Sequence, residues 1–109
     1  MVNQEKLERI RELNDELRVN AQGGVVLVTS GFSNLFFSTQ IKVMKEIQTF
    51  DDFSFDPYGE RDFGSITVDD IQIFWKIDYY AMDMLHGSED PANPEITKRV
   101  LTIYLANEH

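Results

Sequence analysis

Residues 63–78 have the sequence FGSITVDDIQIFWKID, and this stretch decides the fold. Two runs in which apolar and polar residues alternate lie on either side of Asp69-Asp70, which has the length of a tight hairpin turn. Pairing the two runs symmetrically across that turn sets Gly64 opposite Trp75. We therefore predict an antiparallel hairpin with room for the indole beside the glycine. The expected strands are 63–68 and 71–78.

The two faces of this hairpin differ in chemistry. A register slip of one residue would bury Lys76 and Asp78, so the apolar set must face the core. The other face is polar but carries Phe63 and Phe74 as diagonal neighbours, which makes it a candidate binding surface. The expected core face contains Ile66, Val68, Ile71, Ile73, Trp75 and Ile77.

The rest of the chain supplies the other elements. Helical spacing of apolar residues predicts helices over 3–19 and 38–49, and a β-branched run predicts a buried strand over 25–28. The order α-β-α-β-β-α indicates an α+β fold, with a three-stranded, mainly antiparallel sheet and about three helices on one face. The length of 109 residues fits one domain, 1–109.

The third helix is expected near the C-terminus. Asn93 and Pro94 have the residue types of a helix cap and a first helical position, and Glu95 adds an acid to the first turn. A stripe of apolar residues then follows at helical spacing. The stripe consists of Ile96, Val100, Ile103 and Tyr104.

Composition excludes several classes of site. The chain has no cysteine, so it has no disulfide framework, no thiolate zinc site and no cysteine nucleophile. No run approaches membrane-spanning length, and the first residues lack the apolar region of a signal peptide. We expect a cytoplasmic protein without a membrane partner.

The net charge of -9 comes from one segment. Residues 51–90 hold eleven acids against Arg61 and Lys76, together with eight of the thirteen aromatic residues, whereas the flanking segments are neutral. A disordered acidic tail would lack aromatics, so this composition indicates a folded acidic surface. Its sign argues against direct binding of nucleic acid.

Several motifs resemble a known family. They are FDDF at 50–53, DPYGE and DFG within 56–64, IFWKIDYY at 73–80, HGS with DP within 86–91, and TKRVLTI at 97–103. Together they resemble the bacterial family DUF3768, a domain of unknown function, so the resemblance implies no activity. Arg61 departs from the family pattern, in which a histidine follows the glutamate.

The acidic loop offers a possible chemical site. Asp56, Glu60 and Asp62, with Asp78 and His86, could form an oxygen-rich metal site or an acid/base site. Ordinary turn capping is the favoured alternative, because Asp-Pro-Tyr-Gly matches a type I turn and the spacing fails the EF-hand pattern. We expect no metal and no cofactor.

We favour a non-catalytic interaction protein whose acidic, aromatic surface docks a basic partner, with a nucleic-acid mimic as a specific version. One alternative is a small hydrolase or metal-dependent enzyme that uses the acidic loop and His86. Another is a homodimer formed through Phe63 and Phe74. The candidate binding residues are Asp51, Asp52, Asp56, Tyr58, Glu60, Asp62, Phe63, Phe74, Lys76, Asp78 and His86.

Overall fold

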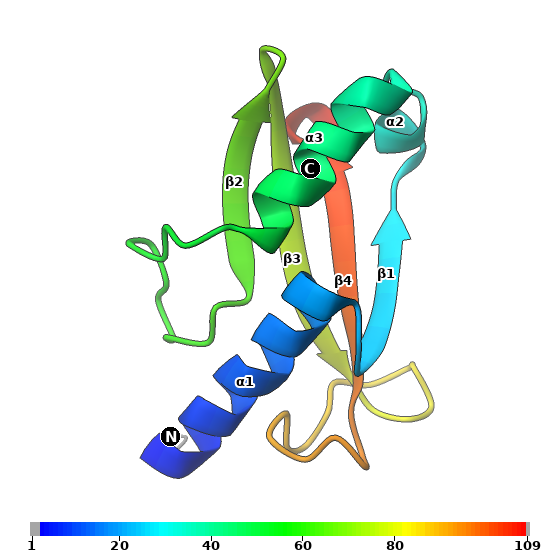
Figure 1. The fold of residues 1–109 in the computed structure, drawn as a ribbon. Coiled ribbons are helices and arrows are strands. Elements are labelled where there is room, and N and C mark those ends of the chain that lie inside the picture. The colour runs from blue at the N-terminus through cyan, green and yellow to red at the C-terminus, as the bar shows by residue number, and fades with distance from the viewer. Residues whose placement is uncertain (1–2, 109) are drawn as a thin grey trace.

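A computed structural model describes residues 3–108 as a four-stranded sheet with helices on one face (Figure 1). The strand order is β1-β4-β3-β2, with β1 parallel to β4 and the other pairs antiparallel. The predicted α+β class is confirmed. The elements are α1 Gln4–Asn20, β1 Gly24–Val28, α2 Ser30–Ser33, α3 Phe37–Gln48, β2 Phe63–Val68, β3 Ile71–Tyr80, β4 Lys98–Leu105 and a 3₁₀ turn, η1, Ala106–Glu108.

The β2–β3 hairpin has the predicted register. Gly64 pairs with Trp75, and the strands are joined by Asp69 and Asp70 alone. Both aspartates have positive φ, 51° and 65°, as a two-residue primed turn requires. Aspartate tolerates this left-handed region better than most residues do. The alternation of apolar and polar residues therefore predicted this part of the fold correctly.

The predicted C-terminal helix is wrong, because residues 98–105 form strand β4. Asn93 and Pro94 lie in a turn before the strand, in which the Asn93 side chain accepts a hydrogen bond from the Glu95 amide at 3.0 Å. The residues predicted to cap a helix therefore form a turn instead. Val100 and Ile103 fit helical spacing, but in a strand they lie on opposite faces, and both are buried.

The predicted three-stranded sheet is therefore wrong as well. β4 lies between β1 and β3, and it makes the sheet four-stranded and mixed. β4 has a strand on each side, and its residues are mostly buried whichever face they lie on, so its sequence lacks clear alternation. That loss of period is why a short apolar run such as 98–105 cannot be assigned from pattern alone.

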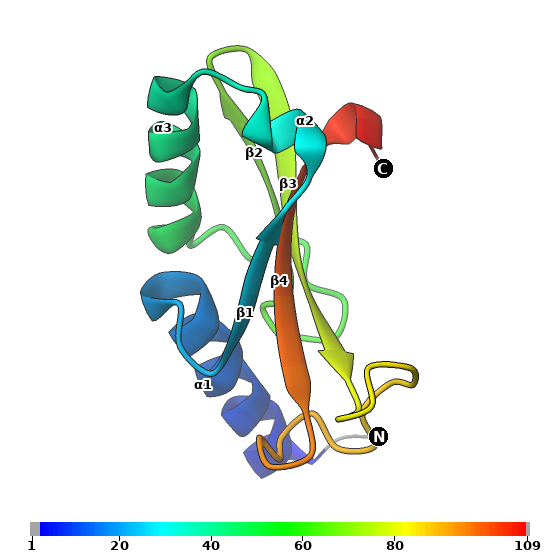
Figure 2. The same ribbon diagram turned by 90° about the vertical axis from the view of Figure 1, so that its right-hand side faces the viewer.

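The core lies between the sheet and the two longer helices. Figure 2 shows α1 and α3 on the same side of the sheet, which leaves the other face without an α-helix; the short 3₁₀ turn η1 projects on that side. Trp75 is fully buried, and a Cβ atom at Gly64 would overlap its indole nitrogen. Phe50 and Phe53 contact the indole edge to face, with ring centroids at 5.4 and 6.5 Å.

Replacing Trp75 with alanine should cost roughly 3 to 5 kcal/mol of unfolding free energy, as large core truncations do. Phe36, which is 83% exposed, provides the control, and Phe36→Ala should change stability by less than about 0.5 kcal/mol. Denaturant melts of both variants measure the difference. A loss below about 1 kcal/mol for Trp75→Ala would contradict the core assignment.

Candidate functional site

Helix α1 fixes the position of the acidic loop, residues 51–62. The Asn14 amide donates to the Glu60 carbonyl oxygen at 2.9 Å, and Arg61 forms an ion pair with Asp15 at 2.9 Å. These contacts join segments about 46 positions apart in the sequence. The loop is therefore held in one conformation by a regular element, as a preformed binding site requires.

A buried polar network continues from Asn14 into the sheet. The same amide donates to the Tyr79 hydroxyl at 2.8 Å, and its oxygen accepts from Arg99 Nε at 2.8 Å. Arg99 is 1% exposed and also donates to the Pro91 carbonyl. Burial raises the pKa of Tyr79 far above its ordinary value, so this hydroxyl stays protonated and donates to Glu60 at 2.9 Å.

One of the candidate loop acids, Asp56, caps a turn. Asp56 accepts from the Gly59 amide through its carbonyl, at 3.0 Å, and from the amides of Glu60 and Arg61 through its carboxylate, at 3.1 and 3.2 Å. These bonds close the Asp-Pro-Tyr-Gly turn. Asp56 thus has the capping role that the sequence favoured over a catalytic one.

Asp62 has the most unfavourable electrostatic environment among the loop acids. Partial burial raises its pKa, and the neighbouring carboxylates of Glu60, Asp56 and Asp78 raise it further. Like charges thus gather where the acidic loop meets β2. A cationic group placed here would relieve that repulsion.

A small pocket opens between the acidic loop and β2. We call it the aromatic pocket; it encloses about 190 Å³ and is lined by Phe50, Asp52, Ser54, Phe55, Phe63, Gly64 and Ser65. Ser54 donates its hydroxyl to Asp52 at 2.7 Å, and this bond lowers the pKa of Asp52. The pocket therefore combines aromatic rings with a stable negative charge. Phe55, at 73% exposure, and Tyr58, at 78%, project from the same loop, where Asp51 is also exposed.

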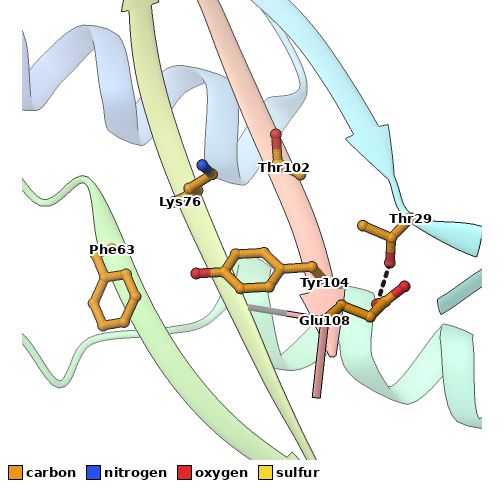
Figure 3. A pocket seen from close by; sticks show the side chains of 6 residues that line it. All are labelled: Thr29, Phe63, Lys76, Thr102, Tyr104 and Glu108. Atoms are coloured by element: carbon orange, nitrogen blue, oxygen red, sulfur yellow. Dashed lines mark hydrogen bonds between the residues drawn. The ribbon is translucent and has the colours of Figure 1, made fainter. Parts of the chain in front are cut away.

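The helix-free face of the sheet carries a row of aromatic rings. Phe63 stacks on Phe74 at 5.6 Å, and Phe74 lies 5.6 Å from Tyr104 across the β3–β4 pair. A second cavity, the open-face pocket, encloses about 480 Å³ next to this row (Figure 3). Phe63 lines both pockets, so they form one continuous surface. The open-face pocket is lined by Thr29, Phe63, Lys76, Thr102, Tyr104 and Glu108.

The charged groups of the open-face pocket are engaged in contacts of their own. Glu108 accepts a hydrogen bond from the Thr29 hydroxyl at 2.6 Å (Figure 3). It also accepts one from the Leu105 amide at 2.8 Å, and Lys76 lies 3.4 Å from Asp78. These bonds lower the pKa of Glu108, which makes it a weak general base at neutral pH. The pocket is thus better suited to binding than to proton transfer.

His86 is not part of either pocket. It lies in the β3–β4 connection, where its Nδ1 is 2.9 Å from Asp83. Among residues 3–108, no group of three or more His, Asp and Glu side chains is arranged to hold a metal ion. The proposed set of loop acids, Asp78 and His86 is therefore not assembled as one metal site within the described residues.

Sequence reasoning missed three parts of this site and of the network that supports it. Tyr104 belongs to it only because β4 is a strand, and the wrong helix assignment hid that position. Asn14 and Arg99 are polar residues within amphipathic patterns, which usually indicates exposure. Phe55 could have been identified, because an aromatic residue in a polar, acid-rich loop is a signal for binding.

Comparison with known proteins adds one finding. A family model described as "Protein of unknown function (DUF3768)" matches residues 28–108. The chain belongs to this family. The match runs from Val28, the last residue of β1, through η1, and so includes both pockets but neither α1 nor the rest of β1. No curated protein and no solved structure matches the chain. Over residues 3–108, none of the helices has the length and apolar character needed to cross a bilayer.

The variant Asp62→Asn should be more stable than the wild type at pH 7, by about 2 °C in Tm, because it removes a carboxylate that its neighbours repel. A raised folded-state pKa means that ionised Asp62 opposes folding. The contribution of the Asp62 side chain to stability is complete below the ordinary pKa of 3.8, where the carboxyl group is protonated. This contribution is lost as the pH rises through the raised pKa. The Tm advantage should therefore shrink toward zero near pH 3.

Asp70→Asn is the matched control, since it removes one exposed charge at the hairpin tip. Thermal melts of the three proteins between pH 3 and pH 7 provide the measurement. An equal gain from Asp70→Asn would show that general charge reduction, rather than the environment of Asp62, explains the effect.

Proposed function

We propose that this protein is a non-catalytic interaction domain that binds a basic protein partner through the aromatic pocket and the adjoining open sheet face. The observation that carries the proposal is the composition of the aromatic pocket. Phe50, Phe55 and Phe63 line it together with the Asp52 carboxylate. Aromatic faces and a carboxylate both attract a cation, so an arginine or lysine side chain is the fitting occupant.

The surroundings of the aromatic pocket favour the same occupant. The carboxylates of Glu60, Asp56 and Asp78 repel that of Asp62 at the adjoining end of β2, and the net charge of the chain is -9. A negative surface accelerates encounter with a basic partner, and exposed aromatics such as Phe55 and Tyr58 supply anchoring area. The contacts of α1 with the loop limit the entropy lost on binding.

Differences in their contacts support separate roles for the acids. Asp56 caps a turn, and Asp69 is bound by Thr39 at 2.8 Å and Lys42 at 3.0 Å. These acids contribute to folding. Among residues 3–108, Asp52 accepts hydrogen bonds only from Ser54, two residues further along its own loop, so its charge is available at the rim of the aromatic pocket.

The test uses short peptides that contain a single arginine, and matched peptides in which neutral citrulline replaces it. Titration followed by backbone amide NMR should shift Ser54, Gly64 and Ser65 with the arginine peptide and leave them in place with the citrulline peptide. Asp52→Asn should weaken this binding about fivefold, in the range of a partly exposed ion pair.

Asp70→Asn again serves as the control, because it changes the net charge by the same amount at the far end of the hairpin. Its affinity for the arginine peptide should equal that of the wild type. If Asp52→Asn and Asp70→Asn weaken binding equally, or if the shifts spread over all exposed acids, the attraction is general and the proposed pocket is wrong.

A further inference from the structure

Strand β1 forms an open, apolar edge of the sheet. It is the first strand in the order β1-β4-β3-β2, and Figure 1 shows no element beyond it. Its sequence, GVVLV, has no charged residue and no proline, and its register with β4 is continuous, without a bulge. Val25 and Leu27 are half exposed, at 51% and 50%. The usual features that prevent edge pairing are thus missing from this strand.

The backbone of β1 offers hydrogen-bonding groups in a defined pattern. The Thr29 amide donates to the Ile103 carbonyl of β4 at 3.1 Å. Since successive residues of a strand point their amide and carbonyl groups to opposite sides, Val25 and Leu27 also face β4. The corresponding groups of Val26 and Val28 are therefore directed toward the open edge.

We propose that β1 pairs with β1 of a second copy of this chain, antiparallel and centred on Val26, to form an eight-stranded sheet. In this register the outward groups of Val26 meet those of the other Val26, and the outward groups of Val28 meet those of Gly24. Val25 lies opposite Leu27 on the helix-free face. The two half-exposed side chains thus meet each other across the axis, and the two-fold contact is self-complementary.

Charge distribution favours a second copy over a basic partner at this edge. β1 has no acid to attract a cation, and residues 1–50 hold six acids and six bases. The acidic loop leads into β2, which is at the opposite edge of the sheet. Two copies joined at β1 therefore keep their acidic loops at the far ends, where mutual repulsion is weakest despite a charge of -9 on each chain.

The oligomeric state of the full chain tests the proposal. Sedimentation equilibrium from about 1 to 200 μM should show a dimer of the 12.7 kDa chain. Val28→Pro should shift dissociation at least tenfold toward monomer, because it removes an outward amide at a position where an edge strand tolerates proline. Ile41→Lys, at an exposed apolar position on α3, is the control and should remain dimeric.

The absence of cysteine from the sequence allows a test of the register. Across the proposed axis the two Val26 Cα atoms lie about 5.5 Å apart, within disulfide range, whereas two Val28 residues lie about 14 Å apart. Mild oxidation should therefore cross-link Val26→Cys and leave Val28→Cys monomeric in denaturing gels. A wild-type chain that stays monomeric at 200 μM, or equal cross-linking of the two variants, would overturn the proposal.

Discussion

The packing of α1 and the acidic loop against β3 and β4 depends on the Asn14 side chain. Its amide donates to Glu60 and Tyr79, and its oxygen accepts from Arg99, so one buried group joins α1, the acidic loop, β3 and β4. All three partners are polar, and Arg99 is a buried cation. Loss of this amide would leave several polar groups without partners in a low-dielectric interior, which is costlier than losing one hydrogen bond.

This network explains how a loop with a strong negative charge can remain ordered. Partial burial of Asp62 and repulsion by its neighbouring carboxylates oppose compaction of the acidic loop. Helix α1 offsets this repulsion through the hydrogen bond from Asn14 to the Glu60 carbonyl and through an ion pair between Asp15 and Arg61. Phe53 adds cation–π interactions, because the guanidinium groups of Arg18 and Arg61 lie over its ring at 5.5 and 5.2 Å. The fixed loop can then hold Asp52 and Phe55 at the rim of the aromatic pocket.

The parts of the fold that sequence could predict are those with a local period. The β2–β3 hairpin has one polar and one apolar face, so alternation identified its strands, its register and the aromatic pair Phe63 and Phe74. β4 is mostly buried between two neighbouring strands and lacks alternation, and the preceding Asn-Pro pair resembles a helix start. The contact between Asn14 and Arg99 joins residues 85 positions apart, and no local pattern can reveal such a pair. The part of the candidate surface that lies on the β2–β3 hairpin and the acidic loop was therefore predictable.

The two edges of the sheet have opposite chemistry, and this has a consequence for partner recognition. The aromatic pocket lies at the β2 edge, among carboxylates, while the β1 edge is apolar and uncharged. In a dimer joined at β1, the two aromatic pockets are separated by seven strand spacings, or roughly 34 Å. The two-fold axis is perpendicular to the sheet, so both pockets open on the same side. A partner with two basic segments at that separation would bind both pockets at once, and the second contact would benefit from a high effective concentration. A weak single-arginine contact is thus compatible with tight and selective binding, because selectivity then depends on the spacing of the basic segments as well as on their charge.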